Sequence, residues 1–247
     1  MIEHFQLKLA GSRMLAPNVR HLAFERADGA PFKFTPGQFI QIHFTYADGK
    51  PTKRSYSVGT PVNGDGVAQL QLVVSYVEGG AATRLLGGLE TGGAIDASGP
   101  YGRFCLQPDD TNQRYLLVAT GTGIAPYRAM LPTIEKRIAA RGCRVVLLYG
   151  ARNEQELLYS DEFEAFAAKH PEFVFHPCLS RAARAAPQPN DRRGHVQDVL
   201  PELDIDPASD IAYLCGNPDM IDATFTLLKD LGMPVKQIRR EKYVSSR

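Results

Sequence analysis

Two turns in the second half of the sequence contain residues whose types and spacing could bind a phosphate. The first, Gly121-Thr122-Gly123-Ile124-Ala125-Pro126, follows the apolar run 116–119. Glycines let a backbone approach a ligand closely, and the N–H groups that begin the next helix, expected near Pro126 or Tyr127, attract anions. The turn predicts a dinucleotide pyrophosphate site. An ordinary strand-to-helix turn is the alternative, because Pro126 stands where the usual fingerprint has its third glycine.

The second turn, Cys215-Gly216-Asn217-Pro218, follows the apolar run 211–215 and precedes another helix-like segment. Open α/β sheets bind ligands outside the carboxyl ends of their strands, where the strand order reverses. Two glycine turns at strand ends therefore predict one shared crevice. The expected contacts of this crevice with a dinucleotide cofactor are Gly121, Thr122, Gly123, Cys215, Gly216, Asn217 and Pro218.

An α/β domain is needed to position these turns. Apolar runs at 115–119, 145–149, 173–179 and 211–215 mostly precede helix-like segments, which indicates a parallel sheet covered by helices. Short alternating segments before residue 107 are typical of antiparallel strands, and the polar segment 107–113 is the expected junction. The sequence predicts two domains: an antiparallel β-barrel over 1–107, followed by an α/β parallel-sheet nucleotide-binding domain over 113–247.

The composition is that of an ordinary globular protein. The chain has 247 residues, 44% of them hydrophobic, and its 28 basic and 27 acidic residues give a net charge of +1, without the basic excess that nucleic-acid binding requires. The amino terminus lacks a signal-peptide pattern and no apolar run reaches membrane-spanning length, so we expect a cytoplasmic protein. The four cysteines lack metal-site spacing, so we expect reduced thiols and no metal.

The barrel half contains the segment Arg54-Ser55-Tyr56-Ser57. Strand alternation places Arg54 and Tyr56 on one face and the two serines on the other. An ordinary exposed strand would show the same pattern, so this segment needs a wider context.

That context is a resemblance that covers essentially the whole chain. The motifs Arg54-Ser55-Tyr56-Ser57, Gly80-Ala81-Ala82-Thr83, Gly121–Pro126, Cys215–Pro218 and Glu241-Lys242-Tyr243 occur in the order and spacing of one family. Together they resemble the bacterial ferredoxin (flavodoxin)–NADP reductases. The resemblance implies an enzyme that holds FAD on the barrel and exchanges hydride with a nicotinamide dinucleotide on the α/β domain.

On the flavin side, the resemblance implies that Arg54 contacts the pyrophosphate, Tyr56 packs against the isoalloxazine and Ser57 lies near flavin N5. A guanidinium matches a pyrophosphate, and a small hydroxyl can hydrogen-bond N5 without blocking hydride. The segment 80–83 would offer N–H groups at the start of a short helix. The expected FAD contacts are Arg54, Ser55, Tyr56, Ser57, Val73, Val74, Ser75, Gly80, Ala81, Ala82, Thr83, Thr122 and Tyr243.

On the dinucleotide side, the resemblance places Ser180 and Arg181 on the 2′-phosphate of NADP, with Arg193 as the second arginine. Arg152 could add charge, although Glu154 and Glu156 would oppose it. These cations predict NADP over NAD. The alternative is that Arg181, Arg184, Arg192 and Arg193 are simply solvated loop charges.

Three residues are the expected catalytic group. The resemblance places Cys215 beside the nicotinamide and Glu241 in the same pocket, where its carboxylate could hydrogen-bond Ser57 or relay a proton. We expect Tyr243 to stack near the flavin or the adenine. The ending departs from the family pattern, because residues 244–247 follow Tyr243.

The resemblance implies ferredoxin or flavodoxin as the electron-carrying partner of a monomer. Such carriers are usually acidic, and Lys50, Lys53, Arg239, Arg240 and Lys242 could complement them. A first alternative is the reductase component of an oxygenase, whose iron–sulfur domain would be separate. A second is a non-catalytic nucleotide-binding module.

Overall fold

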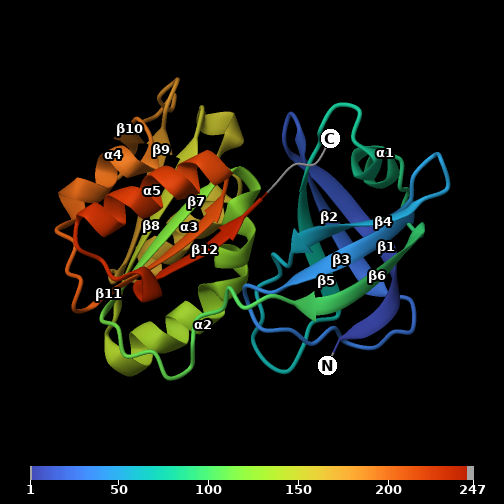
Figure 1. Cartoon of the computed structure of the whole chain (residues 1–247), viewed down its shortest axis with the longest axis horizontal. Coiled ribbons are helices and arrows are strands. Elements are labelled where there is room, and N and C mark those ends of the chain that lie inside the picture. The colour runs from blue at the N-terminus through green and yellow to red at the C-terminus, as the bar shows by residue number, and fades with distance from the viewer. Residues whose placement is uncertain (1, 244–247) are drawn as a thin grey trace. The chain divides into compact units, whose positions relative to one another are not determined.

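The protein forms two compact units in a computed structural model that describes residues 2–243 (Figure 1). Unit 1 comprises residues 2–106 together with 125–132, and unit 2 comprises 107–124 together with 133–243. The helix that begins at Ala125 is therefore divided between the units. Each unit has its own six-stranded sheet.

Unit 1 is an antiparallel barrel, as predicted. Its strand order is β4-β3-β6-β1-β2-β5, and a bridge between Val58 and Leu72 connects the end of β4 to β5. The bridge brings the two end strands of the sheet together and closes it into a barrel at that point. Its elements are β1 (Glu3–Ala16), β2 (Val19–Arg26), β3 (Phe39–Thr45), β4 (Pro51–Ser57), β5 (Gln69–Ser75), α1 (Ala81–Gly87) and β6 (Ala94–Tyr101).

Alternating side chains fill the barrel. In β1, Phe5, Leu7 and Leu9 are buried, whereas the residues between them are exposed. The other strands contribute buried residues in the same way, for example Phe24 from β2 and Ile40 from β3. The residues between the buried ones lie on the outer face of the barrel.

Unit 2 is a parallel sheet in the order β10-β9-β8-β7-β11-β12 (Figure 1). The strand order reverses between β7 and β11, which is the switch point expected to bind a ligand. Its strands are β7 (Arg114–Thr120), β8 (Arg144–Ala151), β9 (Phe173–Leu179), β10 (Arg192–Arg193), β11 (Asp210–Gly216) and β12 (Ile238–Lys242). Its helices are the later part of α2 (Ala125–Arg141), then α3 (Ser160–Lys169), α4 (Val196–Val199) and α5 (Pro218–Asp230), with short 3₁₀ turns at η1 (Gly121–Ile124), η2 (Glu154–Glu156), η3 (Leu200–Leu203) and η4 (Val235–Gln237).

Two details of this sheet differ from the sequence analysis. The sequence predicted four strands, and the sheet has two more. These are β10, which has only two residues, and β12, in which only Ile238 is buried. Helix α2 begins at Ala125, just before the expected Pro126 or Tyr127, because the glycine turn itself forms the 3₁₀ turn η1.

Helix α5 shows how the sequence sets an element that borders the site. Asn217 caps it by accepting hydrogen bonds from the N–H groups of Asp219 and Met220, and Pro218 follows in the first turn. Met220, Ile221, Thr224 and Leu228 form its buried face. The carboxyl end of β11 therefore leads directly into a fixed helix start.

Residues 2–243 contain no helix long and apolar enough to cross a membrane. Within the same range, no group of three or more His, Cys, Asp or Glu side chains is arranged to hold a metal ion. The four cysteines are unpaired thiols.

Candidate functional site

The first glycine turn is packed against the second. A methyl group on Gly123 would lie 2.4 Å from the carbonyl oxygen of Cys215, so only glycine fits there. Gly121 has a φ of +54°, in the left-handed region, and open space where a side chain would point. The loop is therefore closed toward β11 and open at Gly121, which suits the close approach of a phosphate.

The second turn is held by hydrogen bonds to the first strand. Gly216 has a φ of +126°, and a methyl group there would lie 2.5 Å from the Thr120 carbonyl oxygen. The Asn217 N–H donates to Thr120 Oγ1 at 3.1 Å. The Asn217 side chain is occupied as the cap of α5, which is a structural role that the sequence analysis did not assign. The two turns thus meet at the switch point.

Strand β12 places Glu241 next to Cys215. The two residues are register partners in the parallel β11–β12 pair. Burial raises the pKa of the Cys215 thiol well above its ordinary value, the nearby Glu241 carboxylate raises it further, and a hydrogen bond with Tyr243 opposes them. Cys215 is fully buried, so it is a neutral thiol. The Tyr243 N–H donates to the Gly216 carbonyl at 2.8 Å, which fixes the end of β12 beside the same turn.

The arginines cluster at the carboxyl ends of β9 and β10. Arg193 is the register partner of Leu179, and Ser180 and Arg181 follow directly. The exposed Arg181 and Arg193 side chains have no hydrogen bond or ion pair with any residue between 2 and 243. Two unpaired cations at the carboxyl edge are suited to an anionic ligand.

Two other arginines near this edge are engaged within the protein. Arg152 forms an ion pair with Glu156 at 2.5 Å. Arg184 is mostly buried and pairs with Glu164 at 2.6 Å, so the view that it is a solvated loop charge is wrong. Glu154 accepts a hydrogen bond from the Ala185 N–H at 3.1 Å, and Glu156 is the carboxylate that pairs with Arg152.

In unit 1, strand β4 presents the predicted flavin residues. Thr52, Arg54 and Tyr56 are half-buried, Ser55 is exposed and Ser57 is buried. Burial raises the pKa of Tyr56 to about 12, although Arg54 lowers it, so its ring provides a neutral, largely apolar surface. The Arg54 guanidinium donates to the Tyr46 hydroxyl at 2.8 Å. Tyr46 was missed by the sequence analysis, because an isolated tyrosine at a turn gives no signal.

The other predicted flavin contacts in unit 1 lie on β5 and α1. Val73 and Val74 are buried, whereas Ser75 is exposed at the end of β5. Gly80 is the N-cap residue of α1, and Ala81, Ala82 and Thr83 form its first turn. The first N–H groups of a helix have no acceptor within it. The Thr83 hydroxyl closes the preceding loop by accepting from the Val77 N–H at 2.9 Å.

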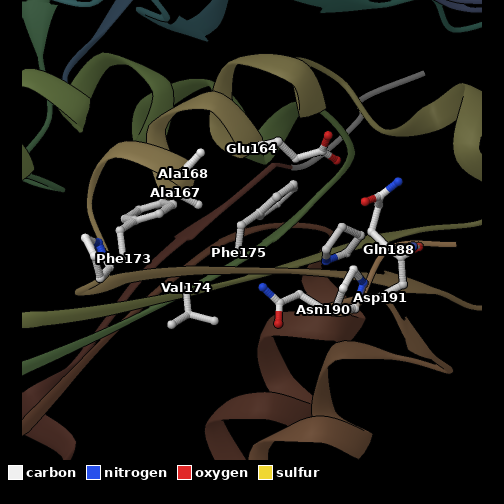
Figure 2. A pocket seen from close by; sticks show the side chains of 12 residues that line it. Glu164, Ala167, Ala168, Phe173, Val174, Phe175, Gln188, Asn190 and Asp191 are labelled. Carbon is white, nitrogen blue, oxygen red and sulfur yellow. The ribbon is translucent and has the colours of Figure 1, made fainter.

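A cavity of about 370 Å³ lies elsewhere in unit 2, between α3, β9 and the loop before β10 (Figure 2). The Phe173 and Phe175 rings point toward α3, and Gln188, Asn190 and Asp191 form its polar side (Figure 2). None of the predicted site residues lines this cavity. It is therefore separate from the carboxyl edge of the sheet.

Comparison with known proteins identifies the class. Residues 6–105 match the oxidoreductase FAD-binding domain and residues 117–225 match the oxidoreductase NAD-binding domain. Ferredoxin–NADP reductase B of Sorangium cellulosum (strain So ce56) is 37% identical over 98% of both chains. The reductase component DmpP of phenol 2-monooxygenase from Pseudomonas sp. (strain CF600) is 31% identical over 94% of this chain, which spans 63% of that protein. A crystal structure of the Amycolatopsis reductase GcoB matches with a TM-score of 0.84 at 28% identity, over 99% of this chain and 71% of that one.

The fold and these matches define an oxidoreductase that binds FAD and a nicotinamide dinucleotide. The chain belongs to the ferredoxin–NADP reductase family, as its motifs predicted. The predicted pair of cofactors is confirmed at that level, and the chain is a reductase that passes electrons to a partner.

Proposed function

We propose that this reductase takes hydride from NADPH and delivers electrons singly to ferredoxin or flavodoxin. The observation that carries the proposal is the 37% identity to a ferredoxin–NADP reductase over 98% of both chains. The two unpaired arginines at the ends of β9 and β10 support NADPH as the donor.

On the flavin side, Arg54 would bind the pyrophosphate, with its guanidinium held in place by the hydrogen bond that it donates to the Tyr46 hydroxyl. Tyr56 would cover the isoalloxazine with a neutral ring, and Ser57 would hydrogen-bond N5. The backbone of Val73, Val74 and Ser75 would bind the flavin edge. The N–H groups of Gly80, Ala81, Ala82 and Thr83 would bind phosphate oxygens, and Ser55, Thr122 and Tyr243 would complete the contacts.

On the dinucleotide side, the glycine turn would bind the pyrophosphate through the N–H groups of Gly121, Thr122 and Gly123. Ser180, Arg181 and Arg193 would bind the 2′-phosphate. Gly216, Asn217 and Pro218 would bind through the backbone, since the Asn217 side chain already caps α5. Arg152 would contribute little, because Glu156 neutralises it.

The catalytic residues would act by position and by proton handling. Bound FAD would supply the exchange between two-electron and one-electron transfer. Cys215, a neutral thiol, would form an uncharged wall that excludes water from the nicotinamide. Glu241, held beside Cys215 by the strand register, would hold or relay a proton through Ser57.

The test of this function is an anaerobic titration of the purified, flavin-loaded protein with NADPH or NADH. We expect NADPH to reduce the flavin at much lower concentration, and the reduced protein to pass electrons to ferredoxin or flavodoxin in an assay coupled to cytochrome c. Reduction by NADH alone would show that Arg181 and Arg193 do not bind the 2′-phosphate of NADP. Absence of reduction by either would leave a non-catalytic nucleotide-binding module.

A second candidate is the reductase component of an oxygenase. The similarity to DmpP over 94% of this chain favours it. It predicts that the reduced protein transfers electrons to an iron–sulfur protein or an oxygenase more than tenfold faster than to ferredoxin or flavodoxin, a difference of about 1.4 kcal/mol in the barrier. The same coupled assay, run with each acceptor at equal concentration, separates the two candidates.

A further inference from the structure

A buried tyrosine on β8, Tyr149, forms a hydrogen bond with the glycine turn of unit 2. It lies near the carboxyl end of β8, between its register partners Ala119 on β7 and Pro177 on β9, and its side chain is fully buried. A buried phenol hydroxyl needs hydrogen-bond partners, because leaving it unpaired is costly. Its partners show what the residue organises.

The hydroxyl of Tyr149 connects two loops at the carboxyl edge. It lies 3.0 Å from the Gly121 carbonyl oxygen and 3.3 Å from that of Glu156, and it accepts a hydrogen bond from the Leu158 N–H at 3.3 Å. A hydroxyl has one proton, and the shorter distance assigns it to Gly121. The glycine turn is thereby fastened to the loop that follows β8.

The hydrogen bond fixes the orientation of one peptide group in the turn. The peptide that joins Gly121 to Thr122 is planar and trans, so its N–H points away from its carbonyl. Because the carbonyl faces Tyr149, the Thr122 N–H faces the opposite way. Gly121 begins the 3₁₀ turn η1 with a left-handed φ and open surroundings, and a glycine backbone is less restrained than that of other residues. The Tyr149 hydroxyl adds a contact from outside the turn that favours this conformation.

The segment that carries Ser180 and Arg181 is held separately, by the backbone at the end of β8. The loop after β8 carries Arg152, whose carbonyl accepts a hydrogen bond from the Arg181 N–H at 3.0 Å. The Ala151 carbonyl likewise accepts from the Ser180 N–H at 3.0 Å. The Ser180–Arg181 segment is therefore held by backbone hydrogen bonds that do not involve the Tyr149 hydroxyl, so loss of this hydroxyl should act on the glycine turn alone.

We propose that Tyr149 is a positioning residue for dinucleotide binding, whose hydroxyl holds the Gly121 peptide so that the Thr122 N–H is presented to the pyrophosphate. This inference rests on the proposed function, since it takes the glycine turn as the pyrophosphate site. Tyr149 does not touch the ligand. It lowers the conformational cost that binding would otherwise meet.

The test compares the full-length, flavin-loaded protein with its Tyr149→Phe variant. The dissociation constant for NADP⁺, measured from the flavin difference spectrum, should rise about tenfold, which corresponds to about 1.4 kcal/mol. The KM for NADPH should rise similarly while kcat, with ferricyanide as acceptor, changes less than about twofold. An unchanged dissociation constant would overturn the proposal.

Tyr115→Phe is the matched control. Tyr115 is also buried, and it lies near the amino end of β7, away from the glycine turn. Its hydroxyl accepts hydrogen bonds from the Arg137 and Arg141 guanidinium groups, each at 2.7 Å. Its removal should leave nucleotide binding unchanged. An equal loss in this variant would show general destabilisation of the sheet and refute the positioning role.

Adenosine 2′-monophosphate, which lacks the pyrophosphate, gives a second comparison. Its affinity should be the same for the wild type and for Tyr149→Phe, and an equal weakening for the fragment and for NADP⁺ would refute the proposal.

If the flavin-loaded wild type shows no spectral response to NADP⁺ or NAD⁺, the proposed function itself fails and the inference falls with it. A wild type that responds and a variant that matches it remove the inference alone.

Amide hydrogen exchange on the wild type covers the case in which the variant does not fold. The Thr122 N–H should become protected when NADP⁺ binds and remain unprotected with adenosine 2′-monophosphate. Equal protection by both, or by neither, would contradict the proposal.

Discussion

At the scale of single residues, charge separates the arginines that hold the structure together from those that are available to a ligand. Arg184 and Arg152 form ion pairs with carboxylates, whereas the side chains of Arg181 and Arg193 have no hydrogen-bond or ion-pair partner between residues 2 and 243. An arginine that is unpaired at the mouth of a site retains its full capacity for a phosphate.

Replacing Arg181 with alanine tests this separation. The KM for NADPH should rise about 10-fold or more, since a charge-assisted hydrogen bond contributes about 1.5–3 kcal/mol, while the KM for NADH should be unchanged. Arg192→Ala is the control, because the Arg192 guanidinium binds the Pro189 and Asp191 carbonyls. Equal losses for NADPH and NADH would show that Arg181 does not read the 2′-phosphate.

The buried thiols predict a dependence of stability on pH. Burial raises the pKa of Cys178 to about 12 and that of Cys215 well above its ordinary 9.0. A group with a raised folded-state pKa stabilises the protein below its unfolded pKa and loses that contribution as pH rises. The free energy of unfolding should therefore fall above pH 9.0, the ordinary thiol value, by up to about 1.4 kcal/mol per pH unit for each thiol.

Denaturant unfolding at a series of alkaline pH values measures this slope. In Cys178→Ala the slope should be shallower than in the wild type, although the variant is less stable at neutral pH because of the cavity it creates. An identical slope in both proteins would show that the pKa of Cys178 is not raised in the folded state.

At the scale of elements, the site depends on two turns that must touch. The contact exists because Gly123 has no side chain, and its place against the Cys215 carbonyl could not be read from glycine spacing alone. The switch between β7 and β11 brings these turns together, although almost one hundred residues separate them in sequence.

Gly123→Ala should separate the turns. The added methyl group would meet the Cys215 carbonyl at 2.4 Å, so the loop must shift. We expect a loss of about 1–3 kcal/mol in stability and at least about a 10-fold weaker affinity for the dinucleotide, measured by denaturant unfolding and flavin difference spectra.

Gly142→Ala is the control, since Gly142 caps α2 with a φ of +63° in open space. It should cost about 1 kcal/mol from backbone strain and leave dinucleotide affinity unchanged. A Gly123→Ala protein that binds normally would contradict the packing argument.

The sequence predicted the elements with strong periodicity and missed those without it. Short alternating segments identified the first half of the chain as antiparallel strands without bounding each one, and long apolar runs identified β7, β8, β9 and β11. The edge strand β12 has one buried residue and β10 has two residues in all, so neither carries a hydrophobic pattern. The pairing of Glu241 with Cys215 therefore depends on β12, a strand that only the structure reveals. The sequence motif that ends at Tyr243 had indicated Glu241 itself. Tyr46 and Tyr149 were missed because their roles arise from hydrogen bonds between distant segments.

At the scale of the whole molecule, the net charge of +1 means that attraction to an acidic carrier would have to come from local groups. Lys53 is exposed on β4, next to Arg54, whereas Lys50 pairs with Asp48 at 3.0 Å. Lys53 is therefore the better candidate in unit 1.

Lys53→Glu should lower kcat/KM for ferredoxin or flavodoxin by about 3- to 10-fold at low salt, with the effect fading as ionic strength rises. Reduction of ferricyanide by NADPH, which bypasses the carrier, provides the internal reference and should be unchanged. Lys136→Glu, an exposed site on α2, is the control variant. A salt-independent loss, or one shared with ferricyanide, would exclude Lys53 from the carrier surface.

The division of helix α2 between the units has a consequence for biosynthesis. Arg128, which belongs to unit 1, donates to the Gly59 carbonyl at 2.7 Å and to Gln71 Oε1 at 2.6 Å, so the barrel includes a segment translated after the first strand of the other unit. Domains usually fold in order as the ribosome delivers them. Here the nascent barrel cannot complete its contacts until residue 132 has emerged, so a chain stalled soon after residue 106 should carry a barrel that is still vulnerable to protease.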